Sequence, residues 1–267
     1  MTVDRRTDVR TISLDVGGTT VPCLFGGSGP PLLWLHGAGG SDNWTAAQEL
    51  LSGSFTVWAP AHPGFAGTVL PPWIHDVHDL AFHYVDLMSA AELDHPTVVG
   101  ISLGGWIATD LAVHRPDLLE CLVLVDAVGL RPTVPMPDLF IMEPADAMRV
   151  LFSNGPPPMP EATGDPIDMI VRMYEEQAAS ARLMWRRSYD PQLERRLHHI
   201  TVPTLVVWGA DDRLLPPAHG RRLASLIPSA RFEEVADAGH VVPLEAPETF
   251  AALVADFALS PAGREDR

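Results

Sequence analysis

Short apolar segments, many of them rich in β-branched residues, alternate along the chain with longer stretches of helical periodicity. Short, near-continuous apolar runs are typical of parallel strands that are covered on both faces. The first two runs flank Val16-Gly17-Gly18-Thr19 and are expected to form a hairpin. In total the pattern predicts eight strands, at Thr11–Leu14, Val21–Phe25, Leu32–Leu35, Phe55–Ala59, Thr97–Ile101, Cys121–Val125, Thr204–Trp208 and Arg231–Val235.

The stretches between these runs carry apolar residues at helical spacing. The clearest stripe lies on one side of a single helix and contains Val77, Leu80, Ala81, Tyr84, Val85 and Met88. Strands that alternate with helices indicate crossovers between parallel strands. We therefore predict an α/β fold with a doubly wound, mostly parallel, eight-stranded sheet. Ligands of such sheets bind beyond the carboxyl ends of the strands, so the residues at those ends are the first candidates for chemistry.

The segment from about residue 131 to residue 200 interrupts this alternation. It contains ten prolines and no convincing strand pattern. It is interpreted as a helical insertion after the sixth strand, which divides the chain into core residues 1–130, a cap at 131–200 and core residues 201–267. Seven of the nine methionines lie in this segment. Two interpretations of them are open: they fill gaps in a small core, or they form an adaptable apolar lid over a pocket. A helical stripe is predicted there at Ile167, Ile170, Val171, Tyr174, Ala178, Ala181 and Trp185.

Composition and charge narrow the possible partners and location. The 267 residues are 46% hydrophobic and 19% charged, a balance typical of globular proteins. The net charge of −16, without a basic cluster, argues against nucleic acid and anionic membrane surfaces as partners. The N-terminal residues show no signal segment, and no apolar run approaches the ~18 residues of a membrane span. Cys23 and Cys121 lie in apolar runs and are expected to be buried thiols, so a cytoplasmic location is predicted.

One serine stands between a predicted strand and a predicted helix, in Gly100-Ile101-Ser102-Leu103-Gly104. The pattern G-x-S-x-G at such a junction describes a nucleophile elbow, a tight turn that exposes the serine hydroxyl at the edge of the sheet. Small residues on either side leave room for the turn and for the packed helix. The start of the helix, at Leu103, adds backbone N–H groups for a developing anion. A serine that only caps its helix is the alternative.

Two further strand ends carry groups that could activate this serine. Asp211 and Asp212 follow the seventh strand, and His240 lies in the loop after the eighth. A serine hydroxyl is a poor nucleophile at neutral pH; it needs a base, and the base needs an acid to orient it. Asp126, at the end of the sixth strand, is a second candidate for the acid. The order Ser, Asp, His on separate strand ends is that of an α/β-hydrolase triad.

From about Thr11 to Leu259 the chain resembles the α/β-hydrolase superfamily, and within it the compact members with a helical cap. Besides the serine motif, the resemblance rests on Leu35-His36-Gly37-Ala38-Gly39-Gly40, Ala59-Pro60-Ala61-His62-Pro63-Gly64-Phe65 and Val207-Trp208-Gly209-Ala210-Asp211-Asp212-Arg213. It implies that Ser102 is the nucleophile, His240 the base and Asp212 the acid, and that backbone N–H groups of Ala38 and Leu103 form the oxyanion hole. It implies neither a cofactor nor a metal ion.

Other polar residues are expected to have no chemical role. His75, His78, Asp79 and His83 could offer metal ligands, but they alternate with the apolar stripe and are interpreted as a solvated helix face. His36 and His62 are expected to be structural hydrogen-bonding groups.

In the cap, the apolar candidates for contact with substrate are Phe140, Met142, Met148, Phe152, Met173 and Trp185.

The triad suits several reactions. A serine nucleophile argues against the dehalogenases and epoxide hydrolases of this fold, which use aspartate. C–C bond hydrolases typically carry Gly-Pro-Gly in the oxyanion loop and tryptophan after the histidine, whereas this chain has Gly37-Ala38-Gly39 and Val241. The leading hypothesis is a serine hydrolase, monomeric or homodimeric, that cleaves a small to medium apolar carboxylic ester through an acyl-enzyme. C–C bond or enol-lactone hydrolysis, a perhydrolase or an acyltransferase, and a ligand receptor on a hydrolase scaffold are the alternatives.

Overall fold

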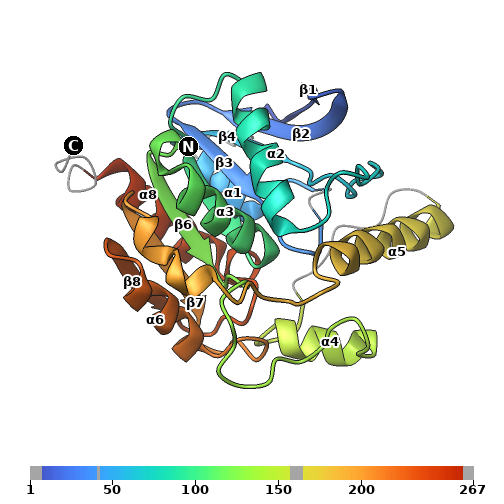
Figure 1. Cartoon of the computed structure of the whole chain (residues 1–267), viewed down its shortest axis with the longest axis vertical. Coiled ribbons are helices and arrows are strands. Elements are labelled where there is room, and N and C mark those ends of the chain that lie inside the picture. The colour runs from blue at the N-terminus through green and yellow to red at the C-terminus, as the bar shows by residue number, and fades with distance from the viewer. Residues whose placement is uncertain (1–7, 41–42, 157–164, 261–267) are drawn as a thin grey trace, which may run out of the picture.

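The computed structural model describes residues 8–40, 43–156 and 165–260. Within these residues, eight strands form one sheet in the order β1-β2-β4-β3-β5-β6-β7-β8 (Figure 1). The β1–β2 and β2–β4 pairs are antiparallel, and all later neighbours are parallel. The strands are β1 (Arg10–Val16), β2 (Thr19–Gly27), β3 (Pro31–Leu35), β4 (Thr56–Pro60), β5 (Thr97–Ile101), β6 (Cys121–Val125), β7 (Thr204–Gly209) and β8 (Ala230–Val235).

The predicted fold class is confirmed. Strands β5 and β6 have the predicted bounds, and the other six are extended or shifted by one or two residues. From β3 the chain goes to β4 on one side of that strand and then crosses to β5 on its other side. The direction in which strands are added therefore changes between β3 and β5. Ligands of such sheets bind at this switch point, and Ser102 follows directly after β5.

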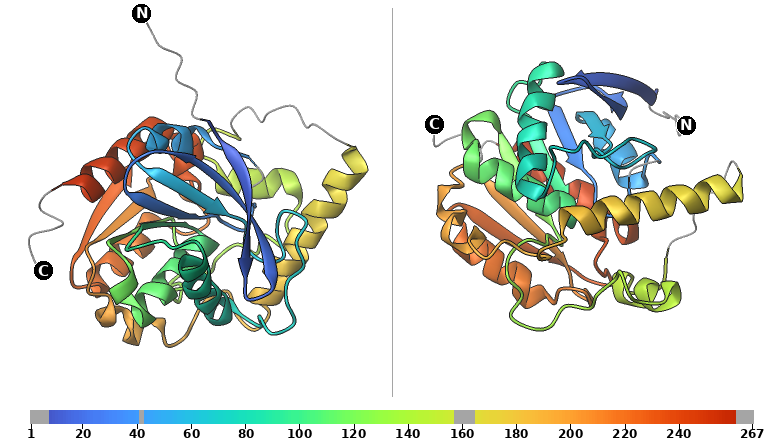
Figure 2. Two further views of the ribbon diagram at one scale, coloured as in Figure 1. Left: turned by 90° about the horizontal axis from the view of Figure 1, so that it is seen from above. Right: turned by 45° about the vertical axis from the view of Figure 1, so that its right-hand side comes forward.

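Helices cover both faces of the sheet (Figures 1 and 2). One face carries α2 (Val77–Ala90), α3 (Leu103–His114) and α6 (Pro217–Leu226), and the other carries α1 (Ala46–Ser52), α7 (Val242–Glu245) and α8 (Pro247–Leu259). A 3-10 helix, Pro116–Leu118, follows α3. Val98 of β5 belongs to the core beneath the first set of helices, and Val99 to the core beneath the second. Burial on both faces explains why the central strands are apolar at every position.

The α2 stripe packs as its spacing predicts, with Val77, Leu80, Ala81, Tyr84 and Met88 buried and Val85 partly buried. Cys23 and Cys121 are buried thiols, and burial raises the pKa of Cys23 to about 12. None of the helices in the described ranges combines the length and hydropathy that crossing a bilayer requires.

Between β6 and β7 the described chain forms α4 (Pro144–Leu151), α5 (Pro166–Leu183) and two 3-10 helices, Leu193–Arg195 and Leu197–His199. In both figures α5 projects from the body of the molecule, on the same side as α4. The proposed cap boundaries enclose these elements. Residues 157–164, which include Met159, and the chain ends at 1–7 and 261–267 lie outside the described residues.

The helix predicted from the stripe is confirmed as α5, but most of the stripe is exposed. Ile167 is 67% exposed, Tyr174 62% and Trp185, just after the helix, 83%. The buried side chains of α5 are instead Ala179, Ser180 and Leu183, close to its C-terminal end. The reason is that this end of the helix packs on the body of the molecule, where Ala179 and Leu183 join the main hydrophobic cluster. Periodicity identified the helix but not the side on which it is covered.

Candidate active site

Ser102 occupies a strained turn between β5 and α3. Its φ of 51° and ψ of −111° lie outside the regions that side chains other than glycine usually adopt. Its N–H donates to the Val125 carbonyl of β6 at 2.9 Å, and its carbonyl accepts from the N–H groups of Trp106 and Val128. The backbone is thus held on both sides of the turn, and the side chain makes no cap hydrogen bond to its own helix. The helix-cap interpretation of Ser102 is therefore wrong.

The flanking glycines are required by close packing. A Cβ atom at Gly104 would lie 2.1 Å from the Leu35 carbonyl oxygen and 2.5 Å from that of His36. One at Gly100 would lie 2.4 Å from the carbonyl oxygen of Gly104. Because these neighbours are backbone atoms, no side chain can move to relieve the clash. The glycines let the first turn of α3 lie directly against the loop that follows β3.

That loop contains the second predicted oxyanion donor. Ala38 lies in an exposed turn that the Gly40 N–H closes by donating to the Gly37 carbonyl at 3.2 Å. A Cβ atom on Gly37 would be 3.4 Å from the Ser102 Cβ, so the turn passes beside the serine. Leu103 is the first residue of α3, where backbone N–H groups have no partner within the helix. The two predicted donors therefore come from segments that meet at Ser102.

His240 connects Ser102 to Asp212. Its Nε2 lies 2.9 Å from Ser102 Oγ, and its Nδ1 lies 2.8 Å from Asp212 Oδ2. A carboxylate accepts, so Nδ1 carries the proton and Nε2 is left to accept from the serine hydroxyl. The other carboxylate oxygen of Asp212 accepts from the N–H groups of Leu214 and Leu215, both at 2.8 Å. Asp212 is 4% exposed and His240 2%, so the pair is shielded from competing water.

Asp126 has a different set of partners. Its Oδ1 accepts from the Gly209 N–H at 2.9 Å and its Oδ2 from the Val242 N–H at 3.3 Å. Full burial, and then the nearby Asp212 carboxylate, raise the pKa of Asp126 well above its usual value. The residue links the last residue of β7 to the first residue of α7. It therefore holds together the two loops that carry Asp212 and His240, while the contact to the imidazole belongs to Asp212.

The C-terminal end of α4 is tied to the loop that carries His240. The His240 N–H donates to the Leu151 carbonyl at 2.8 Å. Glu245 accepts from the Gly239 N–H at 2.7 Å through one oxygen and from the Ser153 N–H at 2.8 Å through the other. Asp211, next to the acid, accepts from the Ser153 hydroxyl at 2.6 Å. Sequence reasoning missed Glu245, because a glutamate in a short helix carries no recognisable motif.

A buried network stands behind the oxyanion turn. The His62 Nε2 lies 2.8 Å from the His36 carbonyl, which can only accept, so Nε2 carries the proton. The His62 Nδ1 therefore accepts from the Tyr84 hydroxyl at 2.5 Å. The His36 Nε2 accepts from the His62 N–H at 2.9 Å, and the two rings stack with centroids 3.7 Å apart. Burial keeps the pKa of His62 well below its usual value, so the ring stays neutral. Both histidines are structural hydrogen-bonding groups, as their loop positions suggest.

The six apolar cap candidates differ widely in exposure. Phe152 is 8% exposed and directly follows Leu151, whose carbonyl accepts from His240. Met142 is partly buried. The other four are largely in solvent, with Phe140 at 42%, Met148 at 40%, Met173 at 55% and Trp185 at 83%. The wall of a closed apolar pocket would bury its side chains, and of the six candidates Phe152 is the one that is buried.

The histidine-rich helix face is only partly solvated. His75 precedes α2 and is exposed, with its ring 3.5 Å from the Asp79 carboxylate. His83 is 1% exposed, and neither of its ring nitrogens has a hydrogen-bond partner among the described residues. Assigning His83 to a solvated face was therefore wrong. Helical spacing puts it beside Leu80 and Tyr84, at the edge of the buried stripe, and burial lowers its pKa to about 4.

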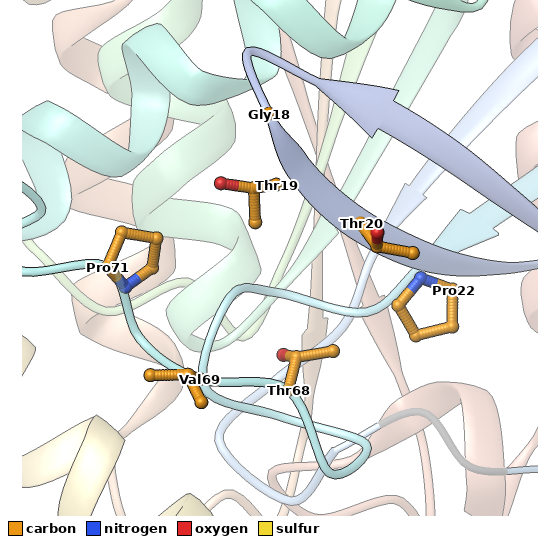
Figure 3. Close-up of a pocket in the computed structure, with 7 residues that line it drawn as sticks. All are labelled: Gly18, Thr19, Thr20, Pro22, Thr68, Val69 and Pro71. Atoms are coloured by element: carbon orange, nitrogen blue, oxygen red, sulfur yellow. The ribbon is translucent and has the colours of Figure 1, made fainter.

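A cavity of about 490 Å³ opens between the β1–β2 hairpin and the loop after β4 (Figure 3). Its lining is small and uncharged: Gly18, Thr19, Thr20, Pro22, Thr68, Val69 and Pro71. Figure 3 shows these side chains coming from two segments that face each other. The cavity shares no lining residue with the Ser102 site, and its lining holds no acid or base to activate the threonine hydroxyls, so it offers no alternative reaction centre.

Comparison with known proteins shows the family of the chain. The sequence model of the alpha/beta hydrolase family matches residues 32–253. A pyrrolizixenacetamide deacetylase of Xenorhabdus hominickii is 25% identical over 92% of this chain and 97% of its own. A 2-hydroxy-6-oxo-2,4-heptadienoate hydrolase of Pseudomonas putida is 27% identical over 86% of this chain and 90% of its own. A bacterial membrane phospholipase A of known structure superimposes with a TM-score of 0.81 at 26% identity, covering 96% of this chain and 87% of that one.

The chain therefore belongs to the alpha/beta hydrolase family. By name these relatives are a deacetylase, a heptadienoate hydrolase and a phospholipase, so membership indicates a hydrolase and leaves the bond that it cleaves open.

Proposed function

We propose that this protein is a serine hydrolase that cleaves small to medium apolar carboxylic esters, with Ser102 as nucleophile, His240 as base and Asp212 as acid. The observation that carries the proposal is the unbroken line of hydrogen bonds from Ser102 Oγ through both ring nitrogens of His240 to Asp212. A serine that only shaped its turn would have no need of a buried, oriented imidazole at 2.9 Å.

The first half of the reaction forms the acyl-enzyme. The Ser102 Oγ attacks the ester carbonyl while its proton passes to His240 Nε2, and the carbonyl electron pair moves onto oxygen. Asp212 accepts from Nδ1–H and stabilises the imidazolium that forms. When the tetrahedral intermediate collapses, the C–O bond to the alcohol breaks, and the proton on Nε2 moves to the departing oxygen. The products are a free alcohol and an ester of Ser102.

The second half uses water in the same way. A water molecule attacks the acyl carbon while His240 Nε2 takes one of its protons. When the carboxylic acid product leaves, Nε2 returns that proton to Ser102 Oγ. In both halves the negative oxygen would accept from the backbone N–H groups of Ala38 and Leu103. Donors fixed in the backbone need no rearrangement when charge develops, which is why such sites contribute strongly to rate. The uncharged substrate needs neither cofactor nor metal, and one copy of the chain holds all of these groups.

The cap is proposed to select the substrate. The described part of residues 131–200 would cover the acyl group, and Phe152 directly follows Leu151, whose carbonyl accepts from the His240 N–H. An apolar ester suits this arrangement, because the polar groups of the site are already engaged with the reacting atoms.

C–C bond hydrolysis is the second candidate, favoured by the 27% identity to the heptadienoate hydrolase of Pseudomonas putida. A panel of substrates separates ester hydrolysis from C–C bond hydrolysis. It contains p-nitrophenyl acetate, butyrate and octanoate, an enol lactone, and a dienone with a scissile C–C bond. We expect kcat/KM to be at least tenfold higher for one of the p-nitrophenyl esters than for the dienone. The reverse order would move the assignment to C–C bond cleavage.

Mass spectrometry of the protein quenched during p-nitrophenyl butyrate turnover tests the nucleophile directly. We expect a butyryl group on the peptide that contains Ser102. Tight binding of an ester without acylation or turnover would instead indicate a ligand receptor built on a hydrolase fold.

A further inference from the structure

Helices α2 and α3 carry two histidines and an aspartate that meet on their packed faces. His78 lies in the first turn of α2, and Asp110 and His114 lie one turn apart on α3. One potential ligand atom from each of the three residues lies within 4.8 Å of the other two. Sequence spacing pointed instead to histidines along α2 alone, because residues on two different helices have no recognisable spacing in the chain.

The carboxylate of Asp110 is buried between the two imidazoles. Asp110 is 3% exposed, whereas the His78 side chain is 47% exposed and that of His114 31%. Its Oδ2 lies 2.8 Å from His78 Nδ1, and its Oδ1 lies 3.7 Å from His114 Nδ1. Burial raises the pKa of Asp110, and the two imidazoles oppose that rise. A buried carboxylate is costly unless positive charge or hydrogen-bond donors are placed beside it.

The hydrogen bonds fix the tautomer of His114. Its Nδ1 lies 2.8 Å from the backbone carbonyl of Asp110, which can only accept, so Nδ1 carries the proton. The Nε2 atom of His114 therefore has a lone pair available. Metal-binding histidines usually donate their other N–H to a carbonyl or carboxylate in this way. The His78 and His114 rings meet in a T-shaped contact with centroids 4.7 Å apart, so both imidazoles lie next to each other beside the carboxylate.

We propose that His78, Asp110 and His114 form a site for a divalent transition-metal ion of the zinc class. Two imidazoles and one carboxylate are a common ligand set for zinc, and water would complete the four-coordinate shell. The ion would displace the proton that His78 Nδ1 shares with Asp110 and would place a divalent positive charge beside the buried carboxylate. Zn–N and Zn–O bonds of about 2.0–2.2 Å separate neighbouring ligand atoms by more than 3 Å, so the exposed imidazoles must rotate slightly on binding.

The site would be structural. It joins α2 to α3, the helix whose N-terminal end follows Ser102. At a rise of about 1.5 Å per residue, His114 lies about 18 Å along the helix from Ser102, too far to touch the reacting atoms. The proposed ester hydrolysis does not involve the ion, so the two proposals fail or hold separately.

Isothermal titration of the metal-free full chain with zinc chloride tests the site. We expect one zinc ion per chain with a micromolar or lower dissociation constant, and a melting temperature that rises with zinc concentration. The variants His78→Ala and His114→Ala each remove one ligand from an exposed position and should weaken zinc binding at least tenfold. Asp110→Asn should do the same, although its buried position makes the histidine variants the primary test.

His75→Ala is the matched control, because it removes an exposed imidazole that also lies beside a carboxylate, that of Asp79. It should bind zinc as the unaltered chain does. Magnesium chloride should cause no shift, since that ion prefers oxygen ligands. Equal zinc affinity in all three histidine variants would place any bound zinc elsewhere and overturn the proposal. So would the absence of stoichiometric binding, which would make the cluster an ordinary ion pair.

Discussion

The Nε2 atom of His240 lies 2.9 Å from the Oγ atom of Ser102, although the two residues are 138 positions apart in the chain. Each is held by contacts that do not depend on the other. Backbone hydrogen bonds to Val125, Trp106 and Val128 fix the turn at Ser102. The backbone of His240 is fixed by the hydrogen bond from its N–H to the Leu151 carbonyl. The pair is therefore aligned before a substrate arrives, as a site that stabilises a transition state requires.

Loss of the acid should cost far more activity than loss of its neighbours. Asp212→Asn should lower kcat for p-nitrophenyl butyrate by about 10⁴-fold, because the imidazole then adopts the wrong tautomer. Asp126→Asn should lower kcat much less. Its main effect should be to reduce the free energy of unfolding by about 1–3 kcal/mol, because the new amide NH₂ group would face a backbone N–H and neither donor would have an acceptor.

Asp211→Asn is the matched control for this series, because it changes the adjacent, exposed carboxylate that accepts from Ser153. Its kcat should stay within a few-fold of the unaltered value. If Asp126→Asn proved to be the variant with the greatest loss of kcat, the acid would be Asp126 and the assignment of Asp212 would be wrong.

Removing the Tyr84 hydroxyl should affect both stability and rate. In Tyr84→Phe the buried Nδ1 of His62 loses its donor, which should cost about 1–3 kcal/mol of unfolding free energy in urea denaturation. His62 also holds the backbone beside Ala38, so kcat should fall while KM stays nearly constant. Tyr174→Phe alters a tyrosine that is 62% exposed and should change stability by no more than about 0.5 kcal/mol. Similar losses in the two variants would contradict a role for the network.

The cap should control which ester binds. Truncating the buried Phe152 to Ala should change the ratio of kcat/KM between octanoate and acetate esters by about tenfold, since each buried methylene contributes ~0.8 kcal/mol. Trp185→Ala removes a side chain that is 83% exposed and should leave the ratio unchanged. If Phe152→Ala lowers stability but leaves the ratio as it was, the segment has no part in selectivity.

Buried neutral histidines make the fold sensitive to acid. The pKa of His83 is about 4 in the folded chain and about 6.5 when unfolded, so below pH 6.5 the unfolded state binds a proton that the folded state does not. This contribution lowers stability as the pH falls from 6.5 towards 4. His83→Leu removes it, so between pH 7.5 and 5 its unfolding free energy should improve by about 2 kcal/mol relative to the unaltered chain.

The exposed His75 serves as the comparison for this measurement. His75→Leu should show no such gain on lowering the pH. A stability difference for His83→Leu that does not vary with pH would mean that the imidazole is not held neutral by burial.

The sequence predicted the sheet well because its central strands are buried on both faces and therefore apolar at every position. Their places at strand ends also predicted that Ser102, Asp212 and His240 would meet, and the structure brings the three side chains into contact. The side of α5 that is covered could not be predicted, because Ile167 and Ala179 are both apolar and only the packing of the helix end decides which is buried. Sequence reasoning missed Glu245 and Asp110 for a related reason. Their partners lie on other elements of the fold, and the local sequence does not indicate which residues those partners are.

Turnover of p-nitrophenyl butyrate by Ser102→Ala, His240→Ala and the double variant tests the central claim most directly. Because the two side chains act as one unit, each single change should remove nearly all of kcat, and the double variant should be little worse than either. Unfolding curves for all three should show that the fold is kept. Activity of Ser102→Ala close to that of the unaltered chain would contradict the account.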